Sequence, residues 1–509
     1  MLRETVTESG AVRGFPGTNA RVTVYKGIPY AAPPVGELRW RAPQPPAKWD
    51  GVRDCYEFGP IAMQTTPGKD PDAFYSKEWH VDPEISMSED CLYLNVWTPA
   101  KKAGEDLPVM MWIHGGGMQE GYGHEMEFDG EQFAKRGIVL VSITYRLNVF
   151  AFMAHKELAA AQPEDPANFG LLDCIAALKW IKRNIANFGG EPENVTIFGQ
   201  SGGGHTCEYL AASPLTKGLF KRAIFQSPGF GALALPASKF FGTGTKSMEE
   251  ASALGQEFLD YLGVKTIEEA RKLDASYVNA KQVQHRAETF KFMFPAQDGV
   301  FCVKDPNQAM IDGDMNDIDI MLTVTGDEFM SWVGDPLDEW EDEAFGKYAD
   351  EFRAAVREKA GSDDPEALKK AASFSSFHAA NLLSAELLRH AGKDFYFEIF
   401  DPEIPGDDAG AFHSADLWFE FDNIRNCWRP FDGHHYDLAR KMCNYFANFA
   451  RTGDPNGKDA DGTDMPEWKL YGDSHNILFL GDEIAPLEKE DPVIRTVVDI
   501  NLKNLGLKD

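Results

Sequence analysis

Short apolar runs rich in β-branched residues alternate along this chain with helical patterns. Six of these runs predict buried strands, at residues 109–113, 138–145, 195–198, 222–226, 318–324 and 395–400. Continuous apolar runs of this length are typical of strands that are covered on both faces, as in a mostly parallel sheet. The pattern therefore predicts a central sheet between two layers of helices.

The helical patterns fall between the predicted strands. In 169–188 the apolar residues recur on one helical face, and 436–451 predicts a helix that ends near Gly453 and Pro455. Alternating strands and helices favour a doubly wound α/β architecture. The segments near 235–292 and 334–389 are mainly helical and charged, so we expect insertions around the sheet of a single 1–509 domain.

Composition narrows the possible partners. The formal charge is −30, and such an acidic chain lacks the basic surface that nucleic-acid binding needs. The N-terminal residues show no signal-peptide pattern, and the best apolar stretch, 137–143, is too short to span a bilayer. Seven cysteines without metal or disulfide spacing favour a reducing, cytoplasmic location.

The most informative segment is 194–204, where an apolar strand runs directly into Gly-x-Ser-x-Gly at 199–203. A nucleophile elbow needs this context, because the serine must sit on a sharp turn that projects its hydroxyl above the sheet. Side chains at Gly199 and Gly203 would clash with the neighbouring strand and helix. Such a short match also occurs by chance, but the preceding strand favours Ser201 as a nucleophile.

A second glycine-rich turn closes an earlier strand, at 112–117. Glycines at a strand end let main-chain N–H groups face a ligand, and each oxyanion donor contributes roughly 3 kcal/mol to transition-state stabilisation. We predict Gly116, Gly117 and Gly202 as the donors, and a structural role for His114. A phosphate-binding loop is the alternative, but the chain lacks its Gly-x-x-x-x-Gly-Lys-Ser/Thr pattern here.

These motifs resemble the type-B carboxylesterase family, which includes cholinesterases and bacterial para-nitrobenzyl esterases. The family's active-serine pattern is matched at 188–203 and its second pattern, around Glu-Asp-Cys-Leu, at 89–99. Shorter stretches at 25–31, 39–41 and 449–456 are similar too. The resemblance spans nearly the whole chain and implies an α/β-hydrolase fold.

The resemblance also implies the base and the acid. Twelve histidines exist, and the segment 410–421 resembles the loop that carries the family's catalytic histidine, which implies His413. The segment 326–329 resembles the acid-bearing strand end and implies Glu328, with Asp327 as the nearest rival. The order serine, acid, histidine agrees with the fold. Ser227 is expected close to the acid.

Three other histidines are not expected to take part in catalysis. His434 and His435 precede a helix in a polar stretch and are expected at the surface. His205 lies four residues after the nucleophile, on the helix predicted to follow it, with its side chain turned away from the serine.

Several positions depart from the family. The family usually has a glutamate directly before the serine, and here that position is Gln200. The loss of this carboxylate weakens any cholinesterase-like preference for cations. The Gln200 amide is expected to contact the catalytic residues. Ala62 stands where a disulfide partner is often found, so Cys91 is expected to be a free buried thiol. Asn148 and Ala151 replace two common glycines, a change that the sequence alone does not explain.

The implied reaction is two-step acyl transfer on a small-molecule ester, without a metal or an organic cofactor. The enzyme is expected to be a monomer or a small homo-oligomer. Amide, carbamate or lactone hydrolysis and acyl transfer to an alcohol use the same constellation. A catalytically dead binding protein is disfavoured, because such proteins typically lose the serine. Candidate residues for the pocket are Trp79, Met118, Phe230, Trp332 and Trp418, but packing in the core explains most large aromatic residues equally well.

Overall fold

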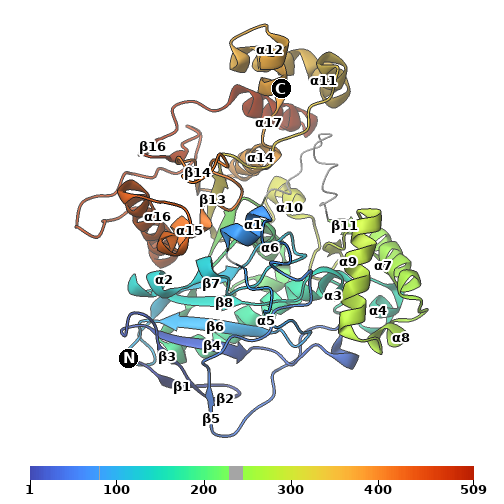
Figure 1. Cartoon of the computed structure of the whole chain (residues 1–509), viewed down its shortest axis with the longest axis vertical. Coiled ribbons are helices and arrows are strands. Elements are labelled where there is room, and N and C mark those ends of the chain that lie inside the picture. The colour runs from blue at the N-terminus through green and yellow to red at the C-terminus, as the bar shows by residue number, and fades with distance from the viewer. Residues whose placement is uncertain (80, 229–244, 509) are drawn as a thin grey trace.

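A computed structural model describes residues 1–79, 81–228 and 245–508 of the chain. Its centre is an eleven-stranded sheet in the order β16-β15-β14-β13-β10-β9-β7-β8-β6-β4-β3 (Figure 1). The strands of this sheet are β3 (Phe15–Pro16), β4 (Thr23–Pro29), β6 (Tyr93–Thr98), β7 (Leu107–Ile113), β8 (Val139–Ile143), β9 (Gly190–Gln200), β10 (Arg222–Gln226), β13 (Asp319–Thr325), β14 (Phe395–Phe400), β15 (Leu478–Leu480) and β16 (Ile484–Pro486).

The central strands, from β8 to β15, pair in parallel, as the apolar runs predict. Alternate residues of each strand enter different hydrophobic clusters. In β7, Met110 and Trp112 pack in one cluster with the helix α16 (Gly433–Thr452), whereas Val109 and Met111 pack in another with α5 (Phe169–Asn184). The sheet is therefore covered on both faces, which explains why its strands read as continuous apolar runs.

The flanks of the sheet are antiparallel. β4 pairs with both β3 and β6, β6 pairs with β8, and β15 pairs with β16 at the opposite edge. A separate three-stranded sheet contains β1 (Glu4–Thr7), β2 (Gly10–Arg13) and β5 (Val52–Asp54). These flanking strands were not among the predicted ones, because most are short or carry polar residues between their apolar positions.

Helices occupy the two segments that the charge pattern predicts as additions to the sheet. The first holds α7 (Met248–Leu262), α8 (Ile267–Arg271) and α9 (Ala275–Thr289); its predicted start at 235–244 lies outside the described residues. The second holds α11 (Leu337–Phe345), α12 (Ala349–Ala360), α13 (Pro365–Ala372) and α14 (Ser376–His390). Figure 1 shows α7, α8 and α9 grouped on one side, far from α11 and α12, which lie beside α17 (Pro492–Asn504).

Chain direction brings the candidate residues together. The parallel strands β7, β9, β13 and β14 are sheet neighbours or near neighbours, so their carboxyl ends share one edge. The turn at 114–117, Ser201, Glu328 and the loop with His413 follow these four ends. None of the described helices is long and apolar enough to cross a membrane.

Candidate active site

Ser201 forms the junction between β9 and α6 (Gly202–Ala212). Its backbone has φ of 57° and ψ of −122°, a conformation that costs a side-chain-bearing residue free energy. The turn is held because the Ser201 N–H donates to the carbonyl of Gln226 in the neighbouring strand, at 2.8 Å. The serine side chain is thereby fixed at the strand end, only 8% exposed.

The glycines of the motif are required by backbone crowding. A Cβ built on Gly203 would lie 2.0 Å from the Ile113 carbonyl oxygen and 2.7 Å from that of His114. A Cβ on Gly199 would lie 2.5 Å from the same Ile113 oxygen. The strand β7 and the first turn of α6 therefore approach each other more closely than any larger residue permits, as the motif predicts.

The glycine turn after β7 lies against the start of α6. Gly116 and Gly117 have positive φ angles of 96° and 61°. A Cβ on Gly202 would come within 2.8 Å of the Gly117 nitrogen and 2.7 Å of the Met118 nitrogen, so these amides cluster beside the serine. N–H groups in the first turn of a helix have no intrahelical partner and favour negative charge. This geometry suits an oxyanion.

His413 and Glu328 are in direct contact. The ring Nδ1 of His413 hydrogen-bonds to Oε2 of Glu328, and the Thr325 N–H lies 3.4 Å from Oε1 of the same carboxylate. Burial pushes the pKa of Glu328 upward, but the charge and hydrogen bond of His413, with smaller contributions from the nearby Ser227 and Thr325, hold that pKa below its ordinary value. Glu328 is thus a buried carboxylate that is paired with the imidazole ring of His413.

Asp327 has a different role. Its carboxylate accepts the Ala411 N–H at 2.9 Å, and its own N–H donates to the Ala411 carbonyl at 3.0 Å. These two bonds join the loop after β13 to the loop that carries His413. The rival acid is therefore engaged with backbone two residues before the histidine, rather than with the imidazole.

The other ring nitrogen of His413 faces Gln200. Its Nε2 atom lies 3.3 Å from the side-chain nitrogen of Gln200, and the serine hydroxyl is not among its hydrogen-bond partners in the described part of the chain. Since an amide nitrogen can only donate, this contact fits a neutral ring whose proton is on Nδ1 and whose Nε2 lone pair is available.

Three aromatic residues that were not predicted surround the histidine. The rings of Phe329 and Phe377 lie with centroids 4.8 and 5.1 Å from the imidazole, and the Tyr75 hydroxyl donates to the His413 carbonyl at 3.0 Å. Phe329 directly follows Glu328 in sequence, which was a usable signal. Tyr75 and Phe377 lie far from His413 in sequence and carry no local motif.

Ser201 and His413 line one cavity of about 1630 Å³, together with Gln200 and the turn 115–117. Of the predicted pocket residues, only Trp79 is among the described lining residues. Met118 and Trp418 are buried in the core, as the open alternative has it, and Trp332 is 71% exposed, so none of these three lines the cavity. Phe230 lies outside the described residues. Phenylalanines that had not been predicted line the cavity instead, at positions 128, 290, 292, 294, 329 and 377.

The structure explains Asn148, at one of the two replaced glycines, and shows the surroundings of Ala151. Asn148 has a positive φ of 49°, which asparagine tolerates better than most residues, and its side-chain amide donates to the carbonyls of Met63 and Gln119 at 2.8 and 3.1 Å. Ala151 packs against Gly170, where a built Cβ would approach the Ala151 methyl to 2.8 Å. Asn148 therefore holds the loop that follows Gly117.

The remaining histidines are engaged elsewhere. His114 is buried, which lowers its pKa to about 4, and its Nδ1 atom lies 2.9 Å from the Gly115 carbonyl. His205 Nδ1 contacts the Glu208 carboxylate at 2.7 Å on α6. These contacts fit structural roles for both side chains.

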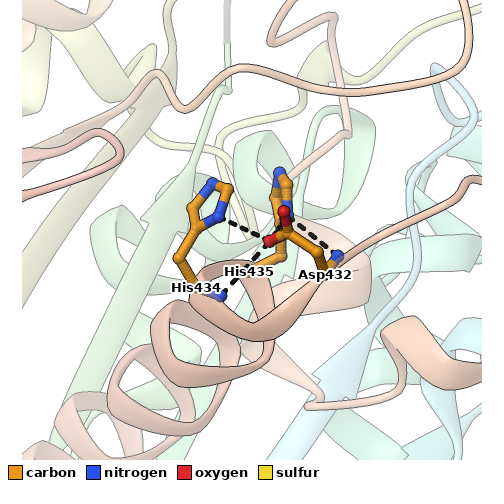
Figure 2. Close-up of side chains that lie close together, drawn as sticks. All are labelled: Asp432, His434 and His435. Carbon is orange, nitrogen blue, oxygen red and sulfur yellow. Dashed lines mark hydrogen bonds and ion pairs between the residues drawn. The ribbon is translucent and has the colours of Figure 1, made fainter.

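His434 and His435 lie with Asp432 at the start of α16 (Figure 2). Their donor atoms form the one group of potential metal ligands in the described residues, within 4.8 Å of one another. The contacts are those of a helix cap: Asp432 accepts the His434 N–H, and His435 Nδ1 accepts the Asp432 N–H at 3.2 Å. His434 is exposed as predicted, but His435 is buried, with Nε2 2.9 Å from the Glu403 carbonyl.

A buried acidic cluster lies next to the histidine loop. Asp416, Glu398 and Glu420 are fully buried, and their pKa values are raised first of all by burial. For Asp416, the nearby charge of Glu328 adds to burial and the pKa reaches about 7. Cys91 is a free buried thiol, as predicted, and all seven cysteines are unpaired.

Comparison with known proteins identifies the family of the chain. The sequence model described as "Carboxylesterase family" matches residues 3–490. A phenmedipham hydrolase from Pseudarthrobacter oxydans is 32% identical over 92% of this chain and 93% of its own length. A para-nitrobenzyl esterase from Bacillus subtilis is 31% identical over 94% of this chain and 95% of its own length. A crystal structure of a Geobacillus stearothermophilus carboxylesterase superposes with a TM-score of 0.77 and 31% identity, covering 97% of this chain and 99% of that one.

Proposed function

This chain belongs to the carboxylesterase family and is a serine carboxylic-ester hydrolase with the α/β-hydrolase fold, and we propose that Ser201, His413 and Glu328 are its nucleophile, base and orienting acid. One observation carries this proposal: a buried carboxylate–imidazole pair and a serine on a strained strand-to-helix turn border the same cavity. Because the acid holds the histidine at Nδ1, the Nε2 lone pair is the one that can take up a proton.

The reaction begins with attack of the Ser201 hydroxyl on the ester carbonyl. His413 takes the hydroxyl proton at Nε2, which requires this atom to exchange its contact with the Gln200 amide for one with the serine. The imidazolium is stabilised by the Glu328 carboxylate, whose lowered pKa keeps it ionised. His413 then protonates the leaving alcohol, and water hydrolyses the acyl-enzyme in a second round of the same steps.

The carbonyl oxygen becomes negatively charged at each tetrahedral stage. We assign its stabilisation to the N–H groups of Gly116, Gly117 and Gly202. Support comes from the close approach of the glycine turn to the first residue of α6. A Cβ at Gly202 would lie only 2.8 Å from the Gly117 nitrogen, closer than van der Waals contact. Each donor is expected to contribute roughly 3 kcal/mol.

The other features of the enzyme follow as proposals. The helical segments are insertions of one catalytic domain, and the enzyme works as a monomer or a small homo-oligomer without a metal. Seven free thiols support a reducing, cytoplasmic compartment. Amide, carbamate or lactone hydrolysis and acyl transfer to alcohols would use the same three side chains, so a panel of such substrates decides how broad the activity is.

The proposal is tested by covalent labelling. An organophosphate with a good leaving group is incubated with the enzyme, and the phosphorylated peptide is identified by mass spectrometry. We expect the adduct on Ser201, and Ser201→Ala should remain unlabelled. An adduct on another residue of a fully inhibited enzyme would remove Ser201 from the nucleophile role.

A further inference from the structure

The cavity that contains Ser201 has one arginine among its described lining residues, Arg286. Arg286 lies near the end of α9 and is partly buried. Its guanidinium donates to the Thr65 hydroxyl at 3.0 Å, and its Cζ atom lies 5.6 Å from the centroid of the Phe292 ring. The proposed reaction needs no positive charge at this position, so the side chain requires another explanation.

Buried arginines in this protein are paired with carboxylates, whereas Arg286 is not. Arg39 contacts Glu89 at 2.6 Å, and Arg146 contacts Asp173 at 2.6 Å. Arg286 forms no ion pair with any other described residue, and its one side-chain hydrogen bond within the described chain goes to the Thr65 hydroxyl. A guanidinium is always charged and has five N–H donors. Most donors of Arg286 are therefore available to a ligand.

The acids of the neighbouring helix are already engaged. The helix α7 lies beside α9 (Figure 1), and its two cavity-lining acids are Glu250 and Glu257. Glu257 is 2.6 Å from the Lys291 ammonium and 3.1 Å from Nε2 of His285. Glu250 closes the capping box at the start of α7. These contacts leave the charge of Arg286 directed at the cavity.

Both anchors of the guanidinium are tied to the segment that follows the glycine turn. Gln64, the residue before Thr65, donates to the Gly121 carbonyl at 3.0 Å and accepts the Gly121 N–H at 2.7 Å. The carbonyl of the residue after Phe292 accepts a hydrogen bond from the Gln119 side chain at 3.0 Å. Arg286 is thus held on a wall that is connected to the proposed oxyanion turn.

The wall beside Arg286 is apolar. Phe292 and Phe294 both line the cavity, and their rings are stacked with centroids 5.9 Å apart. Such rings favour binding of a methylene chain, because apolar surface leaves water. Glutamates at 120, 125 and 127 also line the cavity, so the cavity as a whole is not basic. An anionic group is therefore favoured only where it contacts Arg286 directly.

We propose that Arg286 binds a free carboxylate at the far end of an ester substrate whose carbonyl is attacked by Ser201. The proposal rests on the ester hydrolysis proposed above and specifies the substrate class as esters in which an apolar chain separates the ester bond from a carboxylate. A planar guanidinium binds a carboxylate through two parallel N–H···O bonds. The substrate supplies the negative partner that Arg286 lacks among the described residues.

The first test compares two esters that differ only at the end of the acyl arm. One is mono(para-nitrophenyl) suberate, and the other is its half-amide, in which a primary amide replaces the free carboxylate. After subtraction of the uncatalysed rate, the wild-type enzyme is expected to hydrolyse the carboxylate ester with a kcat/KM at least about threefold higher. The comparison is repeated with adipic and sebacic acid, because the arm must have the right length to reach Arg286.

Substitution of the arginine separates its charge from its shape. Arg286→Gln should lower kcat/KM for the carboxylate ester about tenfold more than for the half-amide ester, because glutamine keeps a polar side chain but removes the charge. Arg286→Lys keeps the charge without the two-pronged geometry, so it should lose only part of the preference.

Lys69→Gln is the matched control. Lys69 lines the same cavity, is exposed and forms no ion pair with another described residue, so its substitution removes the same charge from the cavity. This variant should leave the ratio of the two kcat/KM values within about twofold of the wild-type ratio. An equal effect of Arg286→Gln and Lys69→Gln would show that the ratio follows the total charge of the cavity, and would overturn the subsite.

A second pair of esters places the carboxylate on the alcohol side of the ester bond. These are the acetate esters of omega-hydroxyhexanoic acid and of its amide, with hydrolysis followed by proton release. A preference for the carboxylate in either pair that disappears in Arg286→Gln supports the subsite. Equal hydrolysis within both pairs, or a preference that survives Arg286→Gln, contradicts the subsite and leaves ester hydrolysis intact. If the wild-type enzyme cleaves none of these esters and no para-nitrophenyl acetate, the proposed catalytic centre fails instead.

Discussion

Replacing Glu328 by glutamine tests the assignment of the acid. The substitution keeps the shape of the side chain but removes the charge that pairs with His413. A glutamine amide that donates to Nδ1 would also force the imidazole proton onto Nε2, which is the wrong nitrogen for accepting the serine proton. Loss of the carboxylate in such an arrangement lowers kcat by about 10³–10⁴-fold, equivalent to roughly 4–5.5 kcal/mol of transition-state stabilisation.

The neighbouring residue supplies a matched comparison. Asp327→Asn also removes one carboxylate charge, but the asparagine oxygen can still accept the Ala411 N–H. We expect kcat to fall by less than about fivefold, because at most one hydrogen bond of about 1 kcal/mol is weakened.

Both variants are assayed with the same para-nitrophenyl ester under saturating conditions, with circular dichroism spectra as a check on folding. The reasoning would be refuted if folded Glu328→Gln kept more than a tenth of the wild-type kcat. It would also be refuted if Asp327→Asn lost as much activity as Glu328→Gln.

Three further predictions concern stability. Glu386 is buried, yet Arg495 holds its pKa at about 2. Glu386→Gln should therefore lower the free energy of unfolding by about 3 kcal/mol at pH 7. Urea titrations should show this difference vanishing as the pH falls from about 4.5 to about 2. Burial raises the pKa of Asp416 to about 7 in the folded protein, whereas it is about 4 in the unfolded chain. The free energy of unfolding of Asp416→Asn should therefore rise by about 4 kcal/mol relative to that of the wild type between pH 4 and pH 7. An unchanged difference would contradict the burial of Asp416 as an acid. Asn148→Ala should lower the free energy of unfolding by about 2–4 kcal/mol, because it adds backbone strain and removes two hydrogen bonds. Asn148→Gly removes only the hydrogen bonds and should lower stability less, as measured by thermal denaturation.

The centre of the fold could be predicted because both faces of the sheet are covered. β14 has apolar or aromatic residues at all but one position and β10 has an apolar centre, and the predicted bounds of both strands agree with the observed ones. β15 and β16 have three residues each and pair antiparallel at the edge; the apolar run around β15 is too short to stand out as a strand, and β16 has no longer run. Their existence depends on contacts with distant parts of the chain.

The active site also has one part that the sequence predicts and another that depends on contacts between distant segments. The motif with Ser201 between two glycines is local in sequence and could be found there, although the crowding that excludes larger residues at 199 and 203 comes from the end of β7. His413 and Glu328 are 85 residues apart, and only the family resemblance indicated them. Phe377 packs on His413 from a helix of the second inserted segment, and Trp332, predicted for the pocket, lies at the surface. Which aromatic residues reach a cavity is set by tertiary packing, which residue type does not reveal.

The most direct test of the catalytic account is turnover of an aryl ester by Ser201→Ala, measured against the wild-type enzyme at equal concentration. Without the hydroxyl there is no acyl-enzyme, and the remaining oxyanion donors cannot replace it. We predict a loss of kcat of at least about 10⁴-fold in a variant that keeps the wild-type melting temperature. Turnover within tenfold of the wild-type rate would show that another group performs the attack.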